Sequence, residues 1–213
     1  MTCSLNPGLY AITDPKLLNG DNLISKVESA LLGGCRVVQY RDKAASVEQK
    51  LLRAKALKKL CLHYDAQLII NDDVHLCLQS NADGVHLGKS DGNILNARKI
   101  LGPEKILGVT CHSDLEYAQE CIKLGVDYCA FGRMFPSKTK PDAPSCSLNI
   151  LKQAVKLAKP IVAIGGITLD NIESLMHTPI YSAAVINGLF AEQDIQATAA
   201  KFQGYFTTTF NHL

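Results

Sequence analysis

The chain has 213 residues, of which 47% are hydrophobic and 20% charged, a composition typical of a folded globular protein rather than a disordered one. Its formal net charge of +2 does not favour binding to nucleic acid or to an anionic membrane surface. No apolar stretch approaches the roughly 20 residues of a membrane-spanning helix, and the first residues lack the charged and apolar regions of a signal peptide.

Short apolar runs alternate along the chain with segments of helical periodicity. In the first helical segment Leu23, Val27 and Ala30 fall on one face. Gly33 follows, and glycine readily adopts the left-handed backbone conformation that ends many helices. In chain order, strand and helix pairs are expected at residues 8–13 and 21–32, 36–41 and 46–63, 67–71 and 73–79, 83–87 and 93–101, 105–111 and 113–124, 127–132 and 147–157, 160–164 and 169–177, and 181–187 and 194–206.

These strand–helix units predict the fold class. Eight units joined by short connections indicate a single (β/α)8 TIM barrel over residues 1–213. A doubly wound parallel sheet is the alternative, and the even series of eight units favours the barrel. The length is near the lower limit for this fold, so we expect one domain with catalytic residues at the carboxyl ends of the strands.

The chain contains 8 cysteines and no C-x-x-C pair. This spacing favours neither a zinc ribbon nor a redox motif, and a disulfide scaffold is improbable in a chain of this size. Several cysteines, such as Cys129, lie within apolar runs. We therefore expect buried, reduced cysteines in a cytoplasmic protein.

Polar side chains follow the second predicted strand. Gln39, Arg41 and Lys43 are spaced by two, so in an extended segment they project to one side. Arg41 can hold phosphate oxygens with its planar fork, and Lys43 can do so as a mobile point charge. The alternative is a solvated surface run, because exposed lysines are common.

Acidic and amide groups follow the third predicted strand at Asn71, Asp72 and Asp73. One interpretation is helix capping, in which Asp72 or Asp73 accepts backbone N–H bonds from the next helix. The other is a magnesium site, because Asp91 follows the fourth strand and would be a neighbour of Asp72 across the barrel mouth. We expect both interpretations to apply, to different residues.

Two histidines lie near predicted strand ends. We expect His86, which belongs to an apolar strand, to be a hydrogen-bonded core residue rather than a catalytic base. His112 follows the fifth strand in a more exposed place and is a candidate for orienting its neighbours. Direct catalysis by either histidine is not expected.

Two further regions predict anion binding. The polar loop from Ser137 to Pro144 is long enough to close over a ligand, although a disordered surface loop is the alternative. Gly165 and Gly166 follow the seventh strand and Asn187 with Gly188 the eighth, where barrels usually bind phosphate through backbone N–H groups. A tight turn would also explain the glycines.

Taken in order, these segments resemble the thiamine phosphate synthase family over nearly the whole chain. The segments that carry the resemblance are LYAITD at 9–14, QYRDK at 39–43, INDD at 70–73, HLG at 86–88, TCHS at 110–113, FGR at 131–133, TKP at 139–141 and IGGI at 164–167. The resemblance implies a barrel transferase that joins hydroxymethylpyrimidine diphosphate to a thiazole phosphate, giving thiamine phosphate and diphosphate. It further implies a dissociative substitution in which a pyrimidine methyl cation is captured by the thiazole nitrogen.

The resemblance also implies roles for individual residues. One Mg²⁺ per subunit would be bound by Asp72 and Asp91, and the catalytic cations would be Arg41, Lys43 and Lys140. The residues for the pyrimidine diphosphate would be Gln39, Tyr40, Arg41, Asp42, Lys43, Asn71, Thr110 and Lys140. Those for the thiazole phosphate would be Ser137, Lys138, Thr139, Gly166, Ile186 and Asn187.

Three residues differ from the family pattern. Lys89 stands where Gln is frequent, and it could pair with Asp91 or help to hold diphosphate. Thr110 replaces Ser and keeps the hydroxyl, whereas Asn187 replaces Ser or His. The sequence leaves open the roles of Lys89 and Asn187, how far the 137–144 loop closes, and whether the thiazole carries a carboxylate.

Two other functions compete with the synthase. A related thiazole tautomerase would lack the diphosphate and metal residues, which are present here. A non-catalytic binder of thiamine phosphate would show no turnover. In each case the partners are small molecules, with no nucleic acid or membrane, and the sequence gives no oligomeric state.

Overall fold

The computed structural model describes residues 4–20, 22–89, 92–137 and 144–210, which form a closed parallel barrel. Each strand pairs with the next, and β8 closes the ring against β1. The strands are β1 (Gly8–Ile12), β2 (Val37–Tyr40), β3 (Gln67–Asn71), β4 (Gly84–Leu87), β5 (Ile106–His112), β6 (Tyr128–Phe131), β7 (Ile161–Ile164) and β8 (Ser182–Val185). The predicted (β/α)8 barrel is confirmed.

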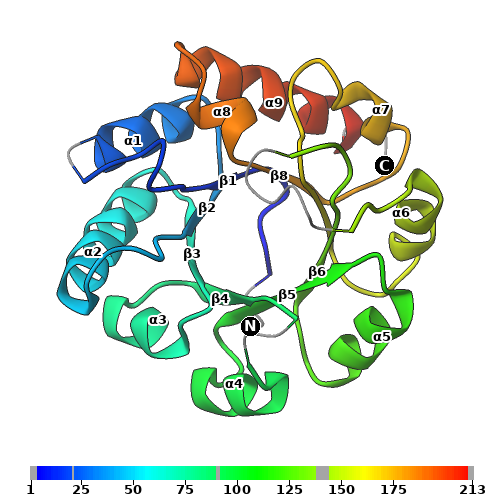
Figure 1. The fold of residues 1–213 in the computed structure, drawn as a ribbon, viewed down its shortest axis with the longest axis horizontal. Helices are drawn as coiled ribbons and strands as arrows, with labels where there is room; N and C mark the ends of the chain where they lie inside the picture. Colours follow the sequence, from blue (N-terminus) through cyan, green and yellow to red (C-terminus); the bar gives the residue numbers. More distant parts are fainter. Residues whose placement is uncertain (1–3, 21, 90–91, 138–143, 211–213) are drawn as a thin grey trace.

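The helices form a ring around the strands, as Figure 1 shows in a view down the barrel. They are α1 (Leu23–Leu32), α2 (Val47–His63), α3 (Val74–Ser80), α4 (Ile94–Leu101), α5 (Leu115–Lys123), α6 (Leu148–Ala154), α7 (Glu173–Met176), α8 (Asn187–Phe190) and α9 (Ile195–Phe210). None of these described helices combines the length and the apolarity needed to cross a bilayer.

The apolar side chains form two cores because successive strand residues point to opposite faces of the sheet. The outer core lies between the strands and the helices, with members such as Val38, Leu68 and Val85. The inner core fills the barrel with Leu5, Tyr10, Ile12, Val37, Ile69, Ile106, Tyr128, Ala130, Val162 and Ala184. The barrel is therefore packed inside, and a ligand can enter only at an end of it.

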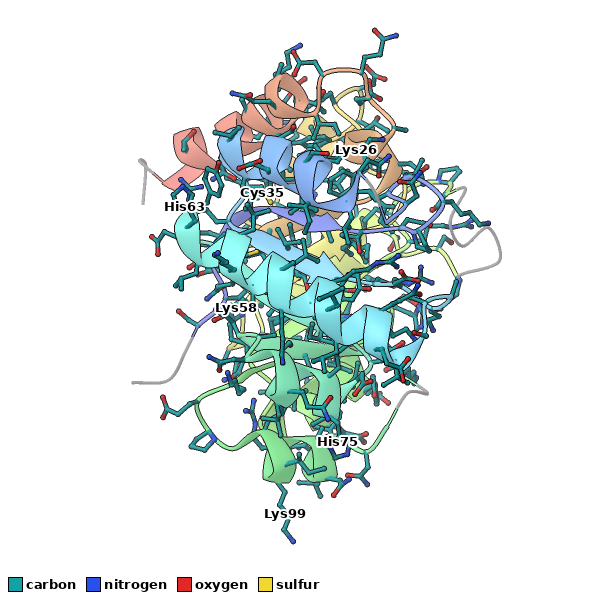
Figure 2. All side chains as sticks on the ribbon, turned by 90° about the vertical axis from the view of Figure 1, so that its left-hand side faces the viewer. Lys26, Cys35, Lys58, His63, His75 and Lys99 are labelled. Carbon is teal, nitrogen blue, oxygen red and sulfur yellow. The ribbon has the colours of Figure 1, made fainter. Side chains whose placement is uncertain are left out.

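Ion pairs lock helices to the amino-terminal ends of the strands. Asp83, just before β4, accepts a hydrogen bond from the backbone N–H of Leu68 at 2.7 Å and pairs with Lys58 of α2 at 2.6 Å. Figure 2 shows Lys58 on α2 from the side of the barrel. Asp127, just before β6, pairs with Arg98 of α4 at 2.5 Å in the same way. This repeated contact stabilises the end of the barrel opposite to the strands' carboxyl ends.

The elements differ from their predicted positions mainly after β7 and β8. The segment predicted as a helix over 169–177 begins with turns, and α7 is only Glu173–Met176. The strand predicted to run to residue 187 ends at Val185, and Asn187 begins the unpredicted helix α8. Helices of one turn are too short to show a hydrophobic period, which explains why the sequence does not reveal α8.

The predicted burial of the cysteines is confirmed for the described part of the chain. The seven cysteines within it are free and buried, at positions 35, 61, 77, 111, 121, 129 and 146. Burial raises the pKa of the Cys35 thiol to about 11, so this group stays a neutral, apolar part of the core. Cys3 lies outside the described residues.

Candidate active site

A cavity of about 390 Å³ opens at the carboxyl end of the barrel. Its volume is within the range of small-molecule sites. The sequence-predicted residues that line it are Gln39, Arg41, Asn71, Thr110, Ser137, Gly166, Ile186 and Asn187. A second cavity of about 310 Å³ is lined by Tyr40, Asp42, Lys43, Lys50, Asn71, Asp72, Asp73 and Leu76. Asn71 lines both cavities, so they adjoin.

The end of β2 places Gln39 and Arg41 on the first cavity. The Gln39 side chain points into the barrel and donates from Nε2 to the Tyr10 hydroxyl at 2.8 Å. The backbone N–H of Arg41 donates to Thr13 Oγ1 at 2.8 Å, and the Thr13 hydroxyl donates to the Arg41 carbonyl at 3.2 Å. These two bonds fix the backbone of Arg41, which lines the cavity.

Tyr40 and Asp42 point to the other face of the same segment. Tyr40 is buried against α2, and burial raises the pKa of its hydroxyl to about 12. The Asp42 carboxylate pairs with Arg53 of α2 at 2.7 Å and accepts from the backbone N–H of Ala44 at 3.0 Å. The Asp42 side chain therefore holds its own loop in place beside the second cavity.

Lys43 and Asp72 both line the second cavity and form an ion pair there. The Lys43 ammonium is 3.3 Å from Asp72 Oδ2, and the exposed fractions of the two side chains are 60% and 25%. Asn71 Nδ2 donates to the same oxygen at 2.6 Å. An ion pair so exposed contributes little to stability, which leaves both groups available to a charged ligand.

Asp73 has a different role from Asp72, as expected. It is the N-cap of α3 and accepts from the backbone N–H of Leu76 at 2.8 Å. Asp72 instead has a left-handed backbone with φ of 64°, which turns its side chain away from the helix end and toward Lys43. The helix-capping interpretation is therefore confirmed for Asp73, and the magnesium interpretation of Asp72 stays a prediction.

Lys89 pairs with Asp114 of the β5–α5 connection at 2.9 Å, and its ammonium lies 4.6 Å from the centre of the Tyr117 ring. The pKa of Asp114 is lowered, first by the hydrogen bond from the Tyr117 backbone N–H and second by the hydrogen bond from Lys89. Asp91, the expected partner of Lys89 or of a metal, lies outside the described residues. Within those residues no group of three or more His, Cys, Asp and Glu side chains is placed to bind a metal.

The loops after β6, β7 and β8 meet on the opposite wall of the first cavity. The backbone N–H of Phe135 donates to the Gly165 carbonyl at 2.9 Å, which ties the start of the β6 loop to the β7 loop. Gly166 has φ of 67°, and a Cβ there would lie 2.3 Å from the Pro136 carbonyl oxygen. Only glycine permits this close approach. Lys138, Thr139 and Lys140 lie outside the described residues.

His86 is a hydrogen-bonded core residue, as predicted. It is 7% exposed, and its two ring nitrogens lie 2.9 Å from the Tyr128 hydroxyl and 2.8 Å from Thr110 Oγ1. His112 lines the cavity at the end of β5, where the pairing with β6 shifts register.

Sequence reasoning gave no site role to several residues that line the first cavity, among them Tyr10, Tyr128, Arg133 and Glu192. For the tyrosines a signal was present, because a hydroxyl on a fully buried strand requires a hydrogen-bond partner. Tyr10 and Tyr128 supply one to each other, at 2.8 Å between their hydroxyl oxygens. Arg133 and Glu192 lie in irregular segments, where no periodicity indicates which way a side chain points.

Comparison with known proteins identifies similar sequences over the whole barrel. Residues 9–189 match the family described as thiamine monophosphate synthase. A thiamine-phosphate synthase of Marinobacter nauticus is 47% identical over 204 residues, covering 95% of this chain and 92% of the relative. One from Alcanivorax borkumensis is 48% identical over 205 residues, covering 94% of each.

Solved structures show the same architecture. The thiamine phosphate pyrophosphorylase of Pyrococcus furiosus superposes with a TM-score of 0.87 at 33% identity, covering 95% of this chain and 96% of that one. A structure described as native KDPGal has a TM-score of 0.73 at 15% identity, covering 99% of this chain and 100% of that one, and shares the fold alone.

Proposed function

Because this chain belongs to the thiamine monophosphate synthase family, we propose that it joins hydroxymethylpyrimidine diphosphate to a thiazole phosphate in a Mg²⁺-dependent, dissociative substitution. The relatives confirm the predicted class of protein, a transferase enzyme of thiamine biosynthesis. The substrate roles, the metal and the order of bond changes are the proposal.

One observation carries the assignment of substrates. Side chains from β2, β3 and β5 converge on one cavity through Gln39, Asn71 and Thr110, while the cations Arg41 and Lys43 lie toward its mouth and the adjoining cavity. A polar inner wall suits an aminopyrimidine ring, and the cationic outer part suits its diphosphate. Lys140 would add a third cation from the 137–144 loop.

The donor set near Asp72 fits Mg²⁺. Mg²⁺ prefers oxygen ligands and is usually held by one or two carboxylates together with substrate phosphates and water. Asp72 offers a partly exposed carboxylate beside Asn71 and Lys43, and Asp91 would be the second acidic ligand. When bound there, the ion would neutralise charge on the leaving diphosphate.

The chemistry assigned to the residues is mainly electrostatic. The C–O bond between the pyrimidine methylene and the diphosphate breaks first, and its electron pair stays on the diphosphate oxygen. Arg41, Lys43 and Lys140 would stabilise that charge. The thiazole nitrogen then forms the C–N bond with its lone pair. The loop over 137–144 would keep water from the cation.

The thiazole phosphate is assigned to the opposite wall. Backbone N–H groups after β7 and β8 can approach a phosphate closely at the glycines, as in other barrels of this fold. Gly166, Ile186, Asn187 and Ser137 line this part of the cavity. Lys138 and Thr139 would complete the phosphate site from the β6 loop.

A glycine substitution tests this wall. We expect Gly166→Ala to raise KM for the thiazole phosphate by about tenfold, because its Cβ would collide with the Pro136 carbonyl and spread the two loops. The matched control is Gly102→Ala, at φ of 70° but with no heavy atom within 4 Å of the added Cβ. Initial rates at varied thiazole phosphate measure both. An equal rise in KM for the thiazole phosphate in both variants would indicate that backbone strain alone causes it.

An isotope experiment tests the order of bond changes. Pyrimidine diphosphate carries ¹⁸O in the bridge between its methylene and the α-phosphorus, and is incubated with the protein and Mg²⁺ without thiazole phosphate. If the C–O bond breaks before capture, the label in recovered substrate moves to non-bridging positions of the α-phosphate. Label that stays in the bridge, in a sample that turns over when thiazole phosphate is added, would favour a concerted displacement.

We also infer a cytoplasmic enzyme. Phosphorylated substrates of this charge do not cross a bilayer unaided, and the free buried cysteines of the described residues suit a reducing compartment.

A further inference from the structure

A chain of hydrogen bonds runs along the inner wall of the first cavity. Gln39 Nε2 donates to Tyr10 Oη at 2.8 Å, and the hydroxyl oxygens of Tyr10 and Tyr128 are 2.8 Å apart. Tyr128 Oη is 2.9 Å from His86 Nδ1, and His86 Nε2 is 2.8 Å from Thr110 Oγ1. The chain joins β1, β2, β4, β5 and β6. Its ends are Gln39 and Thr110, two of the residues assigned to the pyrimidine.

The donors and acceptors in this chain follow one direction. The Tyr10 oxygen accepts from Gln39, and burial raises the pKa of both tyrosines well above the ordinary value, so each hydroxyl keeps its proton. The one order that uses every hydroxyl proton within the chain would have Tyr10 donate to Tyr128 and Tyr128 donate to His86 Nδ1. The reverse order would give the Tyr10 oxygen two donors and leave its own proton unused in the chain.

This direction determines what the two ends offer to a ligand. With this order, His86 would accept at Nδ1, carry its proton on Nε2 and donate it to Thr110, so the Thr110 proton would be available to the cavity. Gln39 directs its amide nitrogen to Tyr10, so its carbonyl oxygen is available as an acceptor. Gln39 is only 3% exposed, and in such a setting a mismatched hydrogen bond is costly.

Packing holds the centre of the chain in place. A Cβ on Gly108 would lie 2.0 Å from Tyr128 Cζ, so the Tyr128 ring occupies the space that the missing side chain leaves. The same ring stacks on His86, with 5.5 Å between centroids, and meets the edge of Tyr10 at 6.1 Å. The Tyr128 hydroxyl therefore has little freedom to turn away.

We propose that Tyr10, Tyr128 and His86 are positioning residues. The two tyrosines hold His86 in its Nε2–H tautomer. The chain thereby presents the Gln39 carbonyl as an acceptor and the Thr110 hydroxyl as a donor. This pair matches an aminopyrimidine, whose exocyclic amine donates and whose ring nitrogen accepts. The ligand assignment rests on the proposed function, whereas the tautomer does not. Acting through Gln39 and Thr110, the three residues need not touch the substrate.

The first test is spectroscopic and needs no substrate. Long-range ¹H–¹⁵N spectra of the wild-type protein should show a neutral His86 protonated on Nε2, with its signal assigned by its loss in His86→Gln. In Tyr128→Phe the Nδ1 signal should shift, because its hydrogen bond is lost. A wild-type His86 protonated on Nδ1 would overturn the proposal, whatever the variants do.

The second test is kinetic. Tyr128→Phe should raise KM for the pyrimidine diphosphate about tenfold and reduce, by a similar factor, the preference for the aminopyrimidine over an analogue lacking the amine. KM for thiazole phosphate should stay within about twofold. Tyr64→Phe, which removes a hydroxyl bonded to Glu28 at 2.9 Å outside the barrel, is the control. Unchanged analogue preference in a folded Tyr128→Phe would overturn the proposal.

The two tests separate this inference from the proposed function. If wild-type protein shows the Nε2–H tautomer but no turnover of the pyrimidine diphosphate, the function fails and the hydrogen-bond chain stands. If the wild-type protein turns over the pyrimidine diphosphate but His86 carries its proton on Nδ1, the function stands and the inference fails.

Discussion

The Asp72→Asn variant is expected to lose Mg²⁺-dependent formation of thiamine phosphate by at least about 100-fold in kcat/KM. The substitution removes the charge that the proposed metal and diphosphate site requires while keeping nearly the same shape. Asn tolerates the left-handed backbone of this position, where φ is 64°, so the fold should be retained. Initial rates at several Mg²⁺ concentrations measure the loss, and circular dichroism checks the fold.

Asp73→Asn is the matched control for this prediction. Asp73 caps α3 through the Leu76 N–H, and Asn is as good an N-cap as Asp, so stability and turnover should stay close to wild type. Replacement by Ala at the same position should instead lower the free energy of unfolding by about 1 kcal/mol. Wild-type turnover in Asp72→Asn would remove Asp72 from the metal site.

The second large effect is expected at Arg41. Arg41→Ala should lower kcat by about 100- to 1,000-fold, because the guanidinium would stabilise charge that appears on the diphosphate only as the C–O bond breaks. Its backbone is held by Thr13 and not by its own side chain, so the fold should not depend on the substitution. Steady-state kinetics with varied pyrimidine diphosphate separates kcat from KM.

Arg36→Ala provides the control on the same strand segment. Arg36 precedes β2 at the other end of the barrel, where its Nη1 donates to the Cys35 carbonyl at 3.3 Å. Cys35 and His63, which mark that end beside α1 and α2, are labelled in Figure 2. Turnover of Arg36→Ala should stay within about twofold of wild type. A rise in KM with unchanged kcat in Arg41→Ala would indicate ground-state binding only.

Much of the fold was accessible from the sequence because buried parallel strands are nearly continuous apolar runs. The run from Gln67 to Asn71 coincides with β3, and α2 begins after Ser46, whose side chain accepts from the Gln49 N–H in a capping box. The same logic placed Gln39, Arg41 and Asn71 at strand ends, where the cavity is found.

Other features depend on tertiary contacts that a local pattern does not contain. Tyr10 and Tyr128 are 118 residues apart and form a hydrogen bond only because β1 and β6 face each other across the barrel. A glycine such as Gly108 is locally unfavourable within a strand, and only the fold shows that the Tyr128 ring occupies the space beside it. Similarly, the sequence left the role of Lys89 open, and only the fold shows that it pairs with Asp114.

The most direct test of the account is a coupled assay on the wild-type protein. Hydroxymethylpyrimidine diphosphate and thiazole phosphate are mixed with the protein, with Mg²⁺ or with a chelator, and both thiamine phosphate and diphosphate are followed. The account predicts equimolar appearance of the two products with Mg²⁺ and loss of both with the chelator. Two results would contradict the account: thiamine phosphate formed at the same rate in the presence of the chelator, or diphosphate released without formation of thiamine phosphate.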